Sequence, residues 1–93
     1  MSRVYGEPVG VWVRDGRPVR FVWRDRLYTV LMVLDHWAVS LEWWRQPEPE
    51  PPGAGGREFW RVDAAPGPAA RPATYELRHD AVTGGWLLMR VWD

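Results

Sequence analysis

Hydrophobic and polar residues alternate along much of the chain with the period of two that is typical of β-strands. Residues 9–14 place three valines on one face, and residues 18–24 place Val, Phe and Trp on one face. Asp15-Gly16 lies between these runs and suits a two-residue hairpin turn, because both positions tolerate a positive φ. The pattern therefore predicts a β-hairpin at the start of the chain.

Residues 27–37 are apolar on both faces, which predicts a central strand covered on both sides. Asp25-Arg26 predicts the short turn before it. Residues 38–45 fit either an extension of this strand or a bend. Residues 46–56 hold four prolines, three glycines and two glutamates, and this composition predicts an exposed, flexible loop. The tryptophans on either side of the loop are expected to anchor its ends in the core.

Three more strands are predicted after the loop, at residues 57–65, 74–80 and 86–93, with a hairpin turn at 81–85. Their alternation places Trp60, Tyr75 and Leu77 on the inner face. The chain is thus expected to be all-β, with about six antiparallel strands that form a small barrel or bent roll. Its 93 residues suit one domain over the whole length.

Composition narrows the functional classes. The chain has no cysteine, which excludes a disulfide, a thiolate nucleophile and a cysteine-ligated metal. Twelve arginines balance twelve acidic residues, so net charge favours neither nucleic acid nor an acidic substrate. No signal-peptide pattern is visible, and the longest apolar run is shorter than the roughly 20 residues of a membrane helix. A soluble, cytoplasmic protein is expected.

The sequence offers no recognisable catalytic site. Neither of the two serines, Ser2 and Ser40, lies in a nucleophile motif. His36 and His79 each lie beside an aspartate, but neighbouring strand residues point to opposite faces, which disfavours a shared metal site. We therefore expect no enzyme activity, no metal and no cofactor.

Two surfaces are candidate binding sites. On the last three strands, Phe59, Arg61, Arg78, Arg90 and Trp92 are predicted to share the outward face. Rings interleaved with arginines suit single-stranded nucleic acid, because bases stack on the rings and phosphates pair with the arginines. The alternative is a solvated face whose arginines pair across strands with Glu58, Glu76 and Asp63.

Protein recognition is the other possibility. Eight tryptophans exceed what a core of this size readily hides, and Trp and Arg are common interface anchors. Trp12, Trp37 and Trp92 are expected nearest the surface, and we take Trp12 and Trp92 as the candidate contacts for a protein partner. An exposed sheet edge would offer a second mode, the addition of a partner strand.

The second half of the chain resembles the C-terminal tail of ImuB, a catalytically inactive relative of Y-family DNA polymerases. The resemblance rests on a Trp-Trp pair at 43–44, Arg-Glu-Phe-Trp-Arg-Val at 57–62, Tyr-Glu-Leu-Arg-His-Asp at 75–80 and Thr-Gly-Gly-Trp-Leu at 83–87. ImuB links the sliding clamp, an error-prone polymerase and a RecA-like partner. The chain has no polymerase-like region, and Gln46 does not begin a clamp-binding motif.

The whole chain resembles a family of small stand-alone bacterial proteins of unknown function. These begin with Val-Tyr-Gly-Glu-Pro-Val, found here at 4–9, and end in Arg-Val-Trp-Asp, found at 90–93. Together the resemblances imply a non-enzymatic protein-interaction module, an accessory or regulator of a DNA-damage-tolerance complex that contacts a polymerase-complex component. The alternative is a single-stranded nucleic-acid-binding domain that uses the arginine and aromatic face.

Overall fold

The computed structural model describes residues 2–40, 56–81 and 83–92, and its regular structure within these ranges is entirely β-strand. The strands are β1 (Ser2–Arg14), β2 (Arg17–Trp23), β3 (Arg26–Ser40), β4 (Gly56–Ala65), β5 (Ala73–Asp80) and β6 (Trp86–Trp92). Each pairs antiparallel with its neighbours in sequence, and β6 pairs with β1. The six described strands thus close into a small barrel, which confirms the all-β, single-domain prediction.

The turns show where the sequence pattern was accurate. Asp15 and Gly16 have φ angles of 52° and 76°, as the predicted hairpin turn requires. The second turn was predicted one residue too late. Arg24 and Asp25 form it, with φ angles of 52° and 62°, and Arg26 already belongs to β3.

The predicted end of the long loop is also wrong by one residue. Gly56, predicted as the last loop residue, is the first residue of β4. The predicted strand extension is confirmed over residues 38–40, which belong to β3. The flexible loop predicted at 46–55 and the predicted anchor tryptophans at 43–44 lie outside the described residues.

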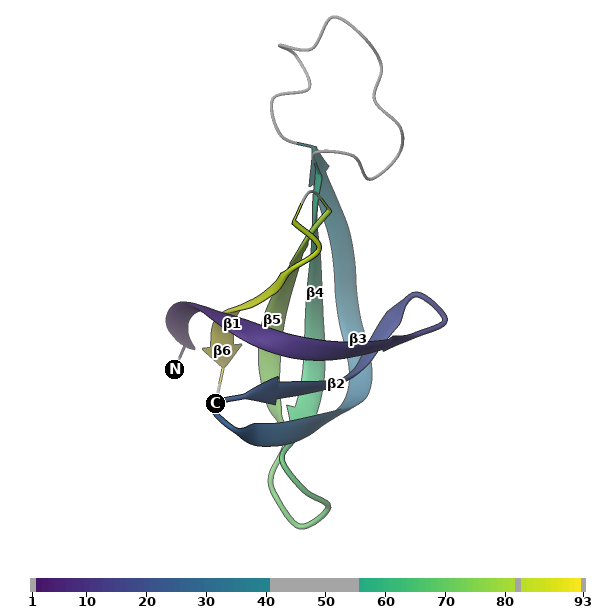
Figure 1. The fold of residues 1–93 in the computed structure, drawn as a ribbon. Coiled ribbons are helices and arrows are strands. Elements are labelled where there is room, and N and C mark those ends of the chain that lie inside the picture. The colour runs from purple at the N-terminus through teal and green to yellow at the C-terminus, as the bar shows by residue number, and fades with distance from the viewer. Residues whose placement is uncertain (1, 41–55, 82, 93) are drawn as a thin grey trace, which may run out of the picture.

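Figure 1 shows β1 and β2 lying across the long strands β3, β4 and β5. Two strands that change partners produce this arrangement. β3 pairs with β2 between Arg26 and Thr29 and with β4 from Thr29 to Ser40. β1 pairs with β6 up to Val9 and with β2 from Gly10 onward. The barrel therefore consists of two crossed sheets that share β1 and β3.

Aromatic rings fill the space between the crossed sheets. Phe21 stacks on Tyr28 with a centroid distance of 4.9 Å, and Tyr75 meets both rings at 5.3 Å. Trp60 is 5% exposed, as its inward assignment required. Buried aliphatic side chains of the last three strands complete the core, namely Val62, Leu77, Leu88 and Val91. A chain of this length buries only about two-thirds of its unfolded surface, so these large rings supply much of the stabilising area.

The prediction that β3 is covered on both faces is wrong. Leu31 and Met32 are 58% and 59% exposed, and Leu27 and Leu34 are also exposed. The pairing of β3 with β4 shifts register between Val30 and Met32 and again after Val33. These irregularities disturb the simple alternation, and the described residues leave these four side chains 45–59% exposed. The apolar side chains of β3 are therefore available for a contact outside the barrel.

Candidate interaction face

A continuous run of aromatic rings and arginines crosses the outer face of β3, β4 and β6. We call it the Trp–Arg ladder and define it by five residues: Trp37, Phe59, Arg61, Arg90 and Trp92. Strand pairing brings them together, because Trp37 lies opposite Phe59, while Arg61 lies opposite Glu76 of β5, which in turn lies opposite Arg90. The structure thus gathers four of the five residues predicted for this face and adds Trp37.

The members of the ladder are in contact. Trp37 stacks on Phe59 with centroids 5.4 Å apart and planes 6° from parallel. The guanidinium of Arg61 lies 5.3 Å from the ring centroid of Trp37 and 4.8 Å from that of Trp92. Arg90 lies 5.6 Å from the same Trp92 ring. Cation–π contacts of this kind are attractive, so they link the rings and arginines into one connected cluster.

Acidic side chains balance this face. Arg61 Nη2 donates a hydrogen bond to Glu76 Oε1 at 3.4 Å, and Arg57 lies 3.8 Å from the Asp80 carboxylate. The pairing alternative considered for the arginines is thus present at Glu76, but Glu58 lies on the opposite face. Two of the four arginines on this face, Arg57 and Arg61, are thus matched by acidic residues of β5, whereas Arg78 and Arg90 form no ion pair with a described residue.

Arg78 is the fifth residue predicted for this face. It lies opposite Phe59 in the β4–β5 pairing, beside the ladder on the same face. Its Nε atom is buried and has no hydrogen-bond partner among the described residues. Arg78 therefore borders the ladder without being tied to its rings.

Exposed apolar side chains border the ladder on β3. Met32 lies opposite Asp63, in the row of outward residues next to that of Arg61. Leu31 and Leu34, at the two register shifts, are also exposed. Rings, arginines and exposed aliphatic side chains thus occupy one continuous outer surface of β3, β4 and β6.

Trp12, the other predicted protein contact, lies elsewhere. It is 53% exposed and sits opposite Arg20 in the β1–β2 hairpin. This part of β1 pairs with β2, and the two strands lie across the long strands β3, β4 and β5 (Figure 1). Trp12 and Trp92 therefore belong to two different surfaces.

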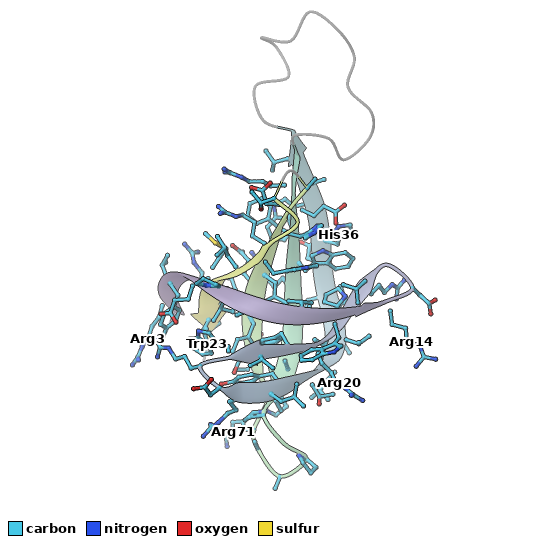
Figure 2. All side chains as sticks on the ribbon, viewed as in Figure 1. Arg3, Arg14, Arg20, Trp23, His36 and Arg71 are labelled. Carbon is cyan, nitrogen blue, oxygen red and sulfur yellow. The ribbon has the colours of Figure 1, made fainter. Side chains whose placement is uncertain are left out.

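The two histidines lie on the inner face of the long strands. The His36 ring stacks on Trp60 with centroids 3.6 Å apart, in the upper half of β3 (Figure 2), and His79 packs against Trp86. His36 Nε2 lies 3.8 Å from Glu58 Oε2. Asp35 is paired with the outward residue Arg61, so the Asp35-His36 dipeptide does divide between two faces. Within the described ranges, no three His, Cys, Asp or Glu side chains are grouped as a metal site would require.

One hollow of about 380 Å³ opens beside the β4–β5 connection. None of its lining residues has a titratable side chain; they are Thr29, Leu31, Ala65, Gly67, Pro68, Ala70 and Pro72. The hollow therefore provides no group for acid–base catalysis. Among the described residues there is also no helix that is long and apolar enough to cross a membrane.

A further contact, which the sequence pattern did not predict, lies in the middle of β1. Glu7 Oε1 accepts hydrogen bonds from Trp23 Nε1 at 2.9 Å and Arg24 Nε at 3.0 Å, while Arg24 Nη2 donates to Glu7 Oε2 at 2.8 Å. Gly6 makes this possible, because its φ of 86° accompanies the register shift between Val4 and Glu7. The Tyr-Gly-Glu stretch was a visible signal, but its partners lie 16 and 17 residues away.

Comparison with known proteins identifies the family. The model of the domain of unknown function DUF6504 matches residues 1–93, which is the whole of this sequence. The chain belongs to the DUF6504 family. No curated protein and no solved structure matches it. Membership confirms a family of unknown function, as the two ends of the chain suggested, while the likeness of this DUF6504 domain to the ImuB tail stays a prediction.

Proposed function

We propose that the protein is a non-enzymatic interaction module that binds a protein partner through the outer face of β3, β4 and β6. The observation that supports this most directly is the Trp–Arg ladder bordered by exposed Leu31, Met32 and Leu34. Tryptophan and arginine are the residues most enriched at the energetic centres of protein interfaces. Exposed aliphatic side chains beside them supply apolar area that a partner would remove from water.

The charges favour a protein over nucleic acid at this face. A polyanion gains affinity when its phosphates are neutralised by free arginines. Arg61 and Arg57 are already paired with Glu76 and Asp80. The acidic partners would repel phosphates that approach the ladder, whereas a protein surface of mixed charge meets no such penalty.

The edge of β3 offers a way to orient the partner. Beyond Thr29, β3 pairs with β4 on one side, and its pairing with β2 has ended. On the other side, no described residue pairs with the β3 backbone beyond Thr29. An added strand could join this edge, beside the apolar side chains that start at Leu31. A partner segment that joins the edge would place alternate side chains over the outer face of β3.

The resemblance to the ImuB tail supports a component of a DNA-damage-tolerance polymerase complex as the partner. The parts of the ladder on β4 and β6 come from the Arg-Glu-Phe-Trp-Arg-Val and Arg-Val-Trp stretches that carry the two resemblances. The module would act as an accessory that binds the complex or competes with the ImuB tail.

The test is an affinity pull-down of the tagged protein from its native host after DNA damage, with and without nuclease, read by mass spectrometry. The double variant Arg61→Ala/Trp92→Ala removes the centre of the ladder. Trp12→Ala/Arg20→Ala is its matched control, since it removes one tryptophan and one arginine from the other exposed surface.

The proposal expects a polymerase-complex component that survives nuclease, is retained by the control variant and is lost with the ladder variant. Partners that disappear with nuclease and with the ladder variant, but are kept by the control variant, would mean that the ladder holds nucleic acid. Partners that both variants retain would rule out the ladder as the binding face.

A further inference from the structure

The outer face of the β1–β2 hairpin carries an unusual group of residues that the proposed function does not use. Trp12 lies opposite Arg20, and Arg14 lies directly opposite Arg17. Gly10 follows in the next outward position of β1, opposite Val22. We call Gly10, Trp12, Arg14, Arg17 and Arg20 the hairpin patch.

The arginines of the patch are not neutralised. None of the three forms an ion pair with a described residue, in contrast to Arg24, Arg57 and Arg61. Asp15 at the hairpin tip is the single acidic residue between positions 8 and 24, and it too lacks an ion pair among the described residues. The hairpin therefore presents an excess of positive charge.

Two features of the patch oppose stability. Like charges directly opposite each other on neighbouring strands are destabilising, and Arg14 and Arg17 stand in that relationship. Trp12 leaves 53% of its surface in water, although the largest apolar side chain gains most from burial. Residues that work against local stability are expected where a protein binds a ligand.

Gly10 supplies an independent observation. It lies inside β1, where glycine weakens a strand, yet its φ is not positive and a Cβ would meet no atom within 4 Å. Neither the backbone nor the packing requires glycine here. The absent side chain instead leaves open space beside Trp12, as expected where a ligand approaches the backbone closely.

We propose that the hairpin patch binds single-stranded nucleic acid. A base would stack on the Trp12 ring in the space above Gly10, and Arg14, Arg17 and Arg20 would pair with the phosphates on either side. Figure 2 shows Arg14 and Arg20 on the same side of the molecule, on the hairpin. An exposed ring flanked by free arginines is the combination that single-strand binding uses. A single strand is favoured over a duplex because stacked, paired bases have no free ring face to offer Trp12.

The proposal is tested by fluorescence anisotropy with a labelled single-stranded oligodeoxynucleotide of about 12 nucleotides. Titrations at several salt concentrations between about 50 and about 200 mM give the dependence of log Kd on log salt. With three phosphates neutralised, the expected slope has a magnitude of about 2. The same sequence as a duplex should bind more weakly.

Four variants separate charge, stacking and fold. Arg14→Ser/Arg17→Ser should lower the magnitude of the salt slope by about 1.4. Arg3→Ser/Arg71→Ser makes the same change of charge at two other exposed arginines that form no ion pair in the described residues, and should leave the slope unchanged. Trp12→Ala should weaken binding roughly 5- to 150-fold.

Gly10→Val is the most informative variant. It fills the space beside Trp12 with a side chain that favours strands, so it should weaken binding while the thermal midpoint stays the same or rises. This result would separate a ligand-binding role of Gly10 from a structural one.

Several outcomes would overturn the proposal. The first is the absence of saturable binding at the lowest salt, and the second is an equal decrease of the salt slope for the two double arginine variants. The third is an unchanged affinity for both Trp12→Ala and Gly10→Val, and the fourth is an equal affinity for duplex and single strand. Binding that is lost with Arg61→Ala/Trp92→Ala but kept with Trp12→Ala would move nucleic acid to the ladder and would overturn the proposed function as well. Failure of the hairpin variants alone leaves the protein-binding role of the ladder intact.

Discussion

Glu7 and Arg24 form a two-pronged ion pair in which both carboxylate oxygens of Glu7 accept hydrogen bonds from one guanidinium, at 3.0 and 2.8 Å. The pair ties β1 to the turn between β2 and β3. The indole N–H of Trp23 donates to the same carboxylate, and Tyr5 packs edge-on against Trp23 at 5.0 Å. A conspicuous motif near the start of the chain thus holds the two crossed sheets together.

Stability should depend on pH through Glu7. The hydrogen bonds from Arg24, followed by that from Trp23, lower the pKa of Glu7. A carboxyl group whose pKa is lower in the folded state stabilises the protein above its unfolded pKa of about 4.3, and this contribution disappears as the pH falls through the folded pKa. Thermal melts of Glu7→Gln should therefore lie below the parent at pH 7 and converge with it in acid. Asp15→Asn, whose carboxylate forms no ion pair among the described residues, is the control; a gap for Glu7→Gln that is constant with pH would contradict the prediction.

Two tryptophans should respond oppositely to truncation. Trp60 is 5% exposed in the core, so Trp60→Ala should lower the free energy of unfolding by about 3–5 kcal/mol, enough to unfold a marginal domain. Trp12 is 53% exposed, so Trp12→Ala should change it by less than about 0.5 kcal/mol. Urea denaturation measures both values. Similar losses at the two sites would show that the inner and outer faces are assigned incorrectly.

Replacement of the two glycines of β1 by alanine should change the stability of the fold in opposite directions. Gly6 has a φ of 86°, so Gly6→Ala should destabilise the fold by about 1–2 kcal/mol. Gly10 has no such constraint and has free space around it, so Gly10→Ala should stabilise the strand by about 0.5–1 kcal/mol. The thermal midpoints of the two variants, measured side by side, test both statements, and a stable Gly6→Ala would show that the bulge does not need glycine.

The contact between Arg61 and Trp92 should be measurable as a coupling energy. Its distance of 4.8 Å from guanidinium to ring centroid predicts about 0.5–2 kcal/mol in a double-mutant cycle with Arg61→Gln and Trp92→Leu. A second cycle that pairs Arg61→Gln with Trp12→Leu should give a coupling below about 0.5 kcal/mol, because those residues lie on β4 and β1, which are not neighbours in the barrel. Equal couplings would mean that the ladder is not a connected unit.

The local pattern of apolar and polar residues was enough to predict most of the strands and the residues on the inner face of the barrel. Alternation placed Trp60, Tyr75 and Leu77 inward, and all three are buried. It failed on β3, because bulges there shift the register and only the complete barrel shows which side lacks a cover. It also assigned the turn after β2 to Asp25-Arg26, since both positions of Arg24-Asp25 adopt positive φ although neither is glycine.

The residues of the candidate sites also fall into two groups: those that local alternation predicts and those that only strand pairing brings together. Outward alternation on the last strands gave Phe59, Arg61, Arg90 and Trp92, since the side-chain period of a strand is a local property. That Trp37 completes the ladder depends on the pairing of β3 with β4, which joins residues more than 20 positions apart. The separation of Trp12 from Trp92 likewise depends on the crossing of two sheets.

The sequence by itself determined the strand class, the hairpin at Asp15-Gly16 and the inward rings, because the pleat and the turn dihedrals act over a few neighbouring residues. Only the tertiary structure decided which arginines are free. Arg61 and Arg24 find carboxylates on other strands, whereas Arg14 and Arg17 face each other across a hairpin. The composition records twelve charges of each sign, but barrel closure sets the distances between them, and Coulomb energies depend on those distances.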